Sequence, residues 1–131
     1  MDRKTLIINA DNFSDLEGFY CEIDNILTKN LGWKTGHNLD AINDLLRGGF
    51  GVHEYEEPIK IIWKYFEKSK IDLGRNATIK YNEERISKVH PSNVQDVNSW
   101  LSELRKGEGE TLCDVILDII NGHEHIELEL K

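Results

Sequence analysis

Three short apolar segments, separated by helical patterns, constrain the fold of this chain most. Residues 5–9 (TLIIN) form an apolar run that ends in a polar residue and is too short for a typical helix. Residues 58–63 (PIKIIW) read as a second strand, with proline at the first position, where the loss of a backbone N–H costs least. Residues 125–130 (HIELEL) alternate strictly between polar and apolar side chains, which predicts a half-buried strand at a sheet edge. Because helical patterns separate these strands, the sequence predicts an α/β fold with a small, three-stranded parallel sheet and right-handed crossovers.

Four segments carry apolar residues at helical spacing. The predicted helices cover residues 14–30, 38–47, 94–104 and 110–121. Ser14 and Glu17 form a capping-box pattern at the start of the first helix, and Asn38 is a favourable N-cap for the second. A short helical turn is expected over residues 64–69. Residues 72–90 are polar and only weakly periodic, so the pattern assigns them no secondary structure.

Length and composition indicate a single domain over residues 1–131. The chain has 39% hydrophobic and 31% charged residues, enough apolar side chains for a core and too many charges for a membrane-embedded protein. It has no apolar run of membrane-spanning length and no signal-peptide pattern, so we expect a cytoplasmic protein. Cys21 and Cys113 match neither a redox pair nor a zinc motif, and we expect both to be reduced, partly buried thiols.

The acidic residues are unevenly distributed along the chain. The formal net charge is −8, which disfavours direct binding to nucleic acid. Residues 36–57 carry a net charge of −4 and residues 107–131 a net charge of −6, whereas residues 64–90 are net positive. If the two acidic segments adjoin in space, they form a patch that attracts a cationic partner. The alternative is that these residues form ordinary solvated helix faces.

Asp40 and Asp44 are the most informative pair in the predicted second helix. Like charges at positions i and i+4 destabilise an isolated helix by a few tenths of a kcal/mol. Asp40 lies in the first turn, where the helix dipole favours a carboxylate, whereas Asp44 lies one turn further in and gains little. The pair therefore suggests an oppositely charged ligand, with chance surface acids as the alternative.

Motifs for catalysis and metal binding are absent from the sequence. It contains no phosphate-binding loop, dinucleotide fingerprint, hydrolase elbow or zincin motif. The glycines of residues 48–51 follow a helix instead of preceding one, so they indicate a helix stop. His123 and His125 would share one face of a strand, but no further ligand with recognisable spacing accompanies them. We therefore predict no catalytic residues, no cofactor and no metal site.

Residues 36–46 (GHNLDAINDLL) resemble the signature of the barstar family, intracellular inhibitors of secreted bacterial ribonucleases. The order of the remaining segments also agrees, including the first strand, the strand that ends in Trp63, and the last helix and strand. The resemblance implies a barstar-like α/β fold with a helical insertion at about 72–107. It also implies an immunity-type inhibitor, monomeric when free, whose acidic helix plugs the active site of a basic ribonuclease or related toxin.

The resemblance also implies roles for individual residues. Asp44 corresponds to the central phosphate mimic and Asp40 to a second carboxylate on the same face. The approach loop contributes Gly36, Asn38 and Leu39. An ungapped alignment of the last helix places Asp118 at an acidic contact position and Val115 beside it.

Several positions depart from the family pattern. Lys34 replaces a tyrosine, and Trp33 beside it supplies aromatic surface. Asn43 replaces a tryptophan on the acidic helix and is expected, like it, to contact the partner. The loop at residues 48–57 is longer than in barstar. One alternative function is a barstar-like adaptor that binds a non-nuclease basic protein without inhibiting it. A third is an enzyme or metal binder with an acidic site.

Overall fold

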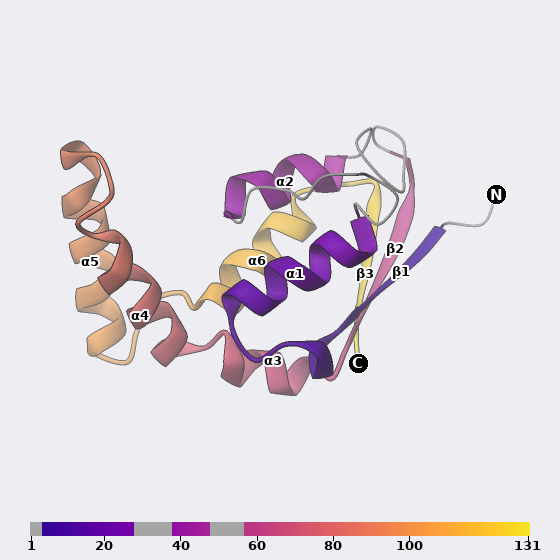
Figure 1. The fold of residues 1–131 in the computed structure, drawn as a ribbon, viewed down its shortest axis with the longest axis horizontal. Coiled ribbons are helices and arrows are strands. Elements are labelled where there is room, and N and C mark those ends of the chain that lie inside the picture. Colours follow the sequence, from indigo (N-terminus) through magenta and orange to yellow (C-terminus); the bar gives the residue numbers. More distant parts are fainter. Residues whose placement is uncertain (1–3, 28–37, 48–56) are drawn as a thin grey trace.

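The computed structural model describes residues 4–27, 38–47 and 57–131 (Figure 1). The predictions for Gly36, Trp33 and Lys34, and for nearly all of the loop at 48–57, lie outside these residues. Within the described part, three strands alternate with helices, and the α/β class predicted from the sequence is confirmed.

The sheet has three parallel strands in the order β1-β2-β3. These are β1 (Lys4–Asn9), β2 (Ile59–Lys64) and β3 (Ile126–Leu130). In the register, Ile59 of β2 pairs with Lys4 on one side and with Ile126 on the other. The C-terminal strand is therefore an edge strand, as its alternating pattern predicts.

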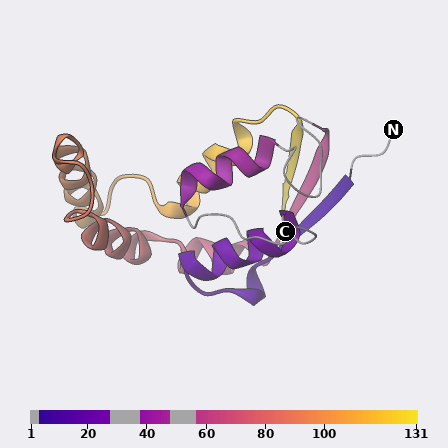
Figure 2. The ribbon, with the colours of Figure 1, turned by 45° about the horizontal axis from the view of Figure 1, so that its top comes forward.

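Helices α1 (Leu16–Leu27), α2 (Leu39–Arg47) and α6 (Leu112–Asn121) lie on one side of the sheet (Figures 1 and 2). They cover the face of β2 that buries Ile59, Ile61 and Trp63. Helices α1 and α6 contact the strands, whereas α2 packs against both α1 and α6. This arrangement leaves one long side of α2 in solvent.

Aromatic rings fill the centre of the core. The Trp63 indole is fully buried and stacks on Phe19 with ring centroids 5.6 Å apart. The ring of Phe66 meets it edge-on at 5.2 Å. The indole Nε1–H donates to the Ser69 hydroxyl over 2.9 Å, so the one polar atom of this ring is satisfied.

The starts of two helices differ from the sequence prediction. Helix α1 begins at Leu16 and is capped by Asp15, whose carboxylate accepts from the Gly18 N–H over 2.8 Å, and not by Ser14. An aspartate is as good an N-cap as a serine, and with Asp15 as the cap the helix starts one residue later than with Ser14 as the cap. Helix α6 begins at Leu112 instead of Glu110, because Thr111 and Asp114 cap each other's backbone N–H in a capping box.

The segment predicted as an insertion is largely helical. After the short α3 (Phe66–Asp72) come α4 (Arg75–Arg85), the 3₁₀ turn η2 (Pro91–Asn93) and α5 (Val94–Arg105). The predicted helix at 94–104 is confirmed, and α4 occupies most of the segment to which the sequence pattern assigned no structure. Residues 75–105, here called the arm, project away from the sheet (Figures 1 and 2).

A buried threonine ties the arm to the core. The Thr78 hydroxyl donates to the Gly74 carbonyl over 2.7 Å and accepts from the Leu112 N–H at the start of α6 over 2.8 Å. Next to it, the Cys113 N–H donates to the Leu73 carbonyl over 2.9 Å. Two backbone N–H groups in the first turn of α6 thus find acceptors in Thr78 and Leu73, at the base of the arm.

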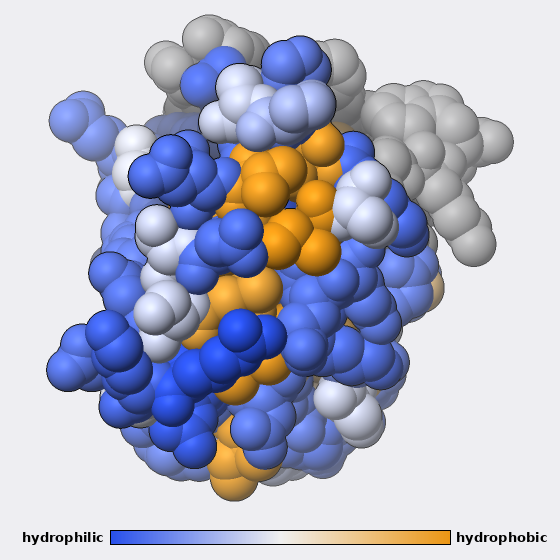
Figure 3. All heavy atoms as spheres, turned by 90° about the vertical axis from the view of Figure 1, so that its left-hand side faces the viewer, coloured by the Kyte–Doolittle hydropathy of each residue, from blue (hydrophilic) through white to orange (hydrophobic). Residues whose placement is uncertain are grey.

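Seen from the end of the arm, apolar surface runs between hydrophilic side chains (Figure 3).

No described helix is both long and apolar enough to span a bilayer.

The two cysteines lie in different environments. Both are free thiols; Cys113 is buried, whereas Cys21 is exposed, so the prediction that both are partly buried is wrong for Cys21. Helix α1 turns this residue outward because its apolar stripe runs through Phe19, Ile23 and Leu27. Burial raises the pKa of the Cys113 thiol to about 11, with Asp114 adding to the shift and Lys70 opposing it.

This difference predicts stepwise thiol labelling. At mildly alkaline pH, a disulfide reagent should modify Cys21 rapidly, whereas Cys113 should react only as the protein opens, because burial suppresses its thiolate. Colorimetric titration should count one fast thiol in the folded protein and two in denaturant. Cys21→Ser should remove the fast phase; a fast phase that survives this substitution would contradict the assignment.

Candidate acidic interface

The solvent face of α2 carries the two carboxylates that the sequence singled out. Ile42 and Leu46 are each 1% exposed on the inner side of the helix, whereas Asp40 and Asp44 are exposed on the outer side. The Asn38 side chain accepts from the Ala41 N–H over 2.8 Å, which confirms Asn38 as the N-cap. Neither aspartate caps or supports the fold through a described contact other than the Asp44–Arg47 pair at 3.9 Å. Such an exposed pair contributes at most about 1 kcal/mol to stability.

Helix α6 brings a second set of acids next to α2. Glu110 precedes the helix, and Asp114 and Asp118 follow on its exposed side. Desolvation first, then the charge and hydrogen bond of Asp118 and the charge of Asp114, raise the pKa of the Glu110 carboxyl above its ordinary value. These carboxylates therefore repel one another and would gain from a cation beside them.

The structure narrows the acidic patch predicted from the charge distribution. Helices α2 and α6 do adjoin, so the two acidic segments meet. However, Glu127 and Glu129 lie on the strand β3 and pair with Lys60 at 3.8 and 3.9 Å. Glu57 pairs with Lys4 at 3.8 Å. The patch therefore excludes Glu57 and the acids of β3, and its described members lie on α2, on α6 and beside the ends of α6.

Replacing Asp118 should make Glu110 a stronger acid. Asp118→Asn removes the neighbouring negative charge that disfavours ionisation of Glu110, so the pKa of Glu110 should fall toward its ordinary value, with the desolvation effect remaining. Because the pKa of Glu110 is raised in the folded protein, protonation of this carboxyl favours folding. Its contribution to stability is present at low pH and is lost as the pH rises through the pKa of Glu110 in the folded state. Carboxyl ¹³C NMR titration measures the shift. Asp96→Asn, on the arm, should leave Glu110 unchanged; equal titration curves in both variants would contradict the coupling.

Two histidines fasten α2 to the segment between α6 and β3. His123 Nε2 lies 2.7 Å from Asn43 Oδ1, and His125 Nε2 lies 2.8 Å from the Leu46 carbonyl oxygen. These imidazoles are thus structural, and within 4–27, 38–47 and 57–131 no group of three potential ligands could hold a metal ion. Asn43, predicted as a partner contact, already uses its side-chain oxygen inside the protein.

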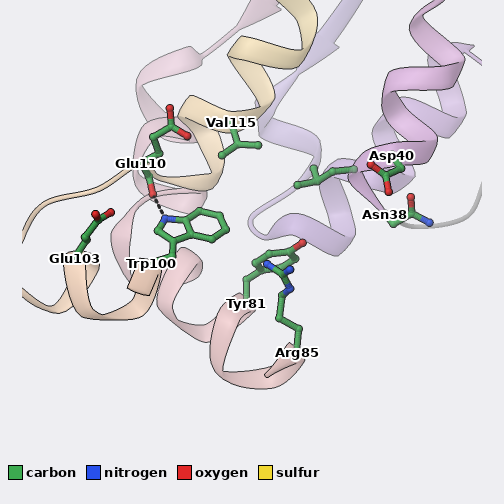
Figure 4. Close-up of a pocket in the computed structure, with 9 residues that line it drawn as sticks. Asn38, Asp40, Tyr81, Arg85, Trp100, Glu103, Glu110 and Val115 are labelled. Carbon is green, nitrogen blue, oxygen red and sulfur yellow. Dashed lines mark hydrogen bonds between the residues drawn. The ribbon is translucent and has the colours of Figure 1, made fainter. Parts of the chain in front are cut away.

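Two hollows flank the acidic face of α2. The first, here called the arm cleft, lies between the start of α2, α6 and the arm (Figure 4). It is lined by Asn38, Leu39, Asp40, Tyr81, Arg85, Trp100, Glu103, Glu110 and Val115. The second lies between the ends of α2 and α6, and Asn43 and Asp118 are among its lining residues.

The predicted contact residues therefore divide into groups. Asn38, Leu39, Asp40 and Val115 line the arm cleft, and Asn43 and Asp118 line the second hollow, whereas Asp44 lies on the exposed surface of α2 outside both. Gly36 and Trp33 fall outside the described residues.

The sequence prediction missed the arm's share of this surface. Tyr81, Arg85, Trp100 and Glu103 line the arm cleft. The available signal was that Tyr81 is the only aromatic residue of α4 and Trp100 the only one of α5. No local pattern shows that these rings meet across the helices, 6.3 Å apart and edge to face.

Comparison with protein families gives one match, to a family described as Barstar (barnase inhibitor), over residues 3–81. The match spans more than half of the chain and includes β1, α1, α2, β2 and α3. It ends within α4, so most of the arm and all of α6 and β3 lie beyond it. No curated protein matches the chain significantly.

Proposed function

Because this chain belongs to the barstar family, we propose that it is a protein inhibitor that binds a basic ribonuclease and blocks the enzyme's active site with α2. Asp44 and Asp40 stand in for substrate phosphates in this interface. Asn38 and Leu39 lie at the start of α2 beside it, and the family resemblance assigns Gly36 a backbone contact with the partner. The protein catalyses no reaction itself.

The exposed aspartate pair on α2 is the observation that carries the proposal. Asp40 and Asp44 lie one helical turn apart on a face that the fold leaves in solvent. A ribonuclease active site must hold consecutive phosphates with cationic side chains, and two carboxylates at this spacing offer such a site matching charges. The acids of α6, with Asp118 and the neighbouring Val115, extend the same surface.

The charge of the chain suits fast capture of a basic enzyme. A net charge of −8 attracts a cationic partner over distances comparable to the Debye length. Electrostatic complementarity of this kind mainly raises the association rate, and salt screens it. An inhibitor that protects the cell producing the nuclease would act in the cytoplasm, as a monomer that forms a one-to-one complex.

Inhibition can be tested by titrating small basic bacterial ribonucleases, barnase among them, with the purified protein. RNA hydrolysis should fall linearly to zero at one equivalent for at least one enzyme, and stopped-flow association should slow as salt rises. Full activity of every enzyme at a large excess of this protein would refute the proposal. Heat-denatured protein serves as the control for carry-over of other inhibitors.

The arm favours one further candidate, an adaptor for a basic protein that is not a nuclease. Most of the arm lies outside the family match, yet its residues line a cleft beside α2. An adaptor would bind through α2 without loss of any nuclease activity. The inhibitor and adaptor functions can be separated by affinity capture from the lysate and the secreted fraction of its own organism. A nuclease assay of the captured partner then shows which function applies.

A further inference from the structure

The arm cleft combines residues of the family region with residues of the insertion. Asn38, Leu39 and Asp40 come from the start of α2, inside the family match, whereas Trp100 and Glu103 come from α5, outside it. Figure 4 shows these side chains around one hollow, with Val115 of α6 between them. The cleft therefore adds a wall to the acidic interface that the matched family region does not contain.

The aromatic wall of the cleft is held in place. Trp100 is half-buried, and its Nε1–H donates to the Glu110 carbonyl over 2.8 Å, which fixes the indole. The Tyr81 ring meets this indole edge-on. Arg85 already places its guanidinium carbon 5.1 Å from the Tyr81 centroid, so this wall is compatible with a planar cation.

The charges around the cleft are predominantly negative. Asp40, Glu103 and Glu110 line it with Arg85 as the only opposing charge among its lining residues. Across the parts of the chain that the structure describes, no salt bridge joins any of these three acids to a basic side chain. An incoming cation would thus meet carboxylates that have no ion-pair partner in the described structure, beside an aromatic face.

We infer that the arm cleft receives an arginine side chain from the surface of the partner ribonuclease, and that the arm thereby selects among ribonucleases. The guanidinium would stack on Trp100 and pair with Glu103, while its aliphatic stem contacts Leu39 and Val115. Asp40, on the opposite wall of the cleft (Figure 4), adds to the negative potential that attracts the cation. Arginine suits this site better than lysine because its planar group can stack and donate two parallel hydrogen bonds. The inference rests on the proposed function, because it assigns the partner group beside the α2 interface.

The cleft can be tested without the partner. The probe is the blocked tripeptide Gly-Arg-Gly, with Gly-citrulline-Gly as the neutral, isosteric control. In ¹H–¹⁵N NMR spectra, the arginine peptide should shift the Trp100 indole signal saturably, and the citrulline peptide at least several-fold less. Equal shifts with both peptides, or none with either, would overturn the inference.

Two matched variants extend this test. Glu103→Gln should weaken binding of the arginine peptide several-fold, because it removes one carboxylate from the cleft. Glu108→Gln makes the same charge change at an exposed site that does not line the cleft, and should leave binding unchanged. Both positions are exposed, so both variants should fold. Equal effects of the two variants would mean that only net charge matters, against the inference.

The variants Glu103→Gln and Glu108→Gln also distinguish failure of the inference about the arm cleft from failure of the proposed function of α2. With a ribonuclease that the protein inhibits, Glu103→Gln should raise the dissociation constant about 3- to 10-fold, mainly through faster dissociation, and Glu108→Gln should not. If the two variants bind equally while an α2 variant fails, the inference is wrong and the proposed function stands. If no ribonuclease binds, the proposed function is wrong, and the peptide titration still decides whether the cleft takes a guanidinium.

Discussion

Replacing Asp44 with alanine should weaken binding to the partner ribonuclease by at least about 30-fold, which corresponds to about 2 kcal/mol, the usual threshold of an interface hot spot. Asp44 is exposed near the middle of α2, and its charged neighbour Arg47 lies 3.9 Å away. In the complex, the substitution would leave a cation of the enzyme's active site buried without a carboxylate. Isothermal titration calorimetry, or competition kinetics for tighter complexes, measures the loss. Asp40→Ala should act in the same direction.

Asp11→Ala is the matched control for this prediction. Asp11 is an exposed aspartate in η1 (Ala10–Asn12), the 3₁₀ turn after β1, which packs against α1 and α3. Its loss reduces the net negative charge by the same amount as the loss of Asp44, so it should change only the salt-dependent association rate, and slightly. Thermal unfolding should show that Asp44→Ala remains folded, because an exposed ion pair contributes little. Equal losses of affinity in Asp11→Ala and Asp44→Ala would exclude α2 as the interface.

Replacing Trp63 with alanine should lower the free energy of unfolding by about 3–5 kcal/mol, the usual cost of truncating a buried aromatic side chain to alanine. The ring is fully buried between Phe19 and Phe66. Its removal also leaves the buried Ser69 hydroxyl without its donor. Because a domain of this size has a total stability of about 5–15 kcal/mol, the variant should be marginal. Urea unfolding followed by far-UV circular dichroism gives the value.

Trp100→Ala tests whether this cost reflects burial or merely the loss of a tryptophan. The Trp100 ring is only half-buried on the arm, and its one hydrogen bond goes to the carbonyl of an exposed residue. Its substitution should therefore cost much less stability than that of Trp63. Comparable losses in the two variants would contradict the central position of Trp63 in the core.

The strands and the buried faces of the helices could be predicted from local patterns. The alternation in residues 125–130 and the apolar spacing in α2 each report which side of an element faces the core, and this information lies within a few residues. The exact residues at which helices start were harder to predict from the sequence. Ser14 and Asp15 are both good caps, and the choice between them depends on how the chain enters from η1 and Phe13.

The candidate site likewise contains residues that local sequence patterns identify and contacts that only the folded structure shows. Asp40 and Asp44 are recognisable from their spacing and from the residues around them, because a like-charge pair on a helix face is a local feature. The bond between Asn43 and His123 joins residues 80 positions apart, and no pattern in either segment predicts it. That contact gives Asn43 a structural role, which the sequence did not reveal, in addition to the partner contact predicted for it.

Short-range patterning was thus sufficient for the class of fold, the strand positions and the acidic face of α2, because each depends on the period of a single element. The arm cleft required the folded chain. Its walls come from α2, α4, α5 and α6, and it exists because Thr78 and Leu73 tie the base of the arm to the first turn of α6. Long-range packing and hydrogen bonding bring those side chains together, and these interactions leave no periodic signal in the sequence.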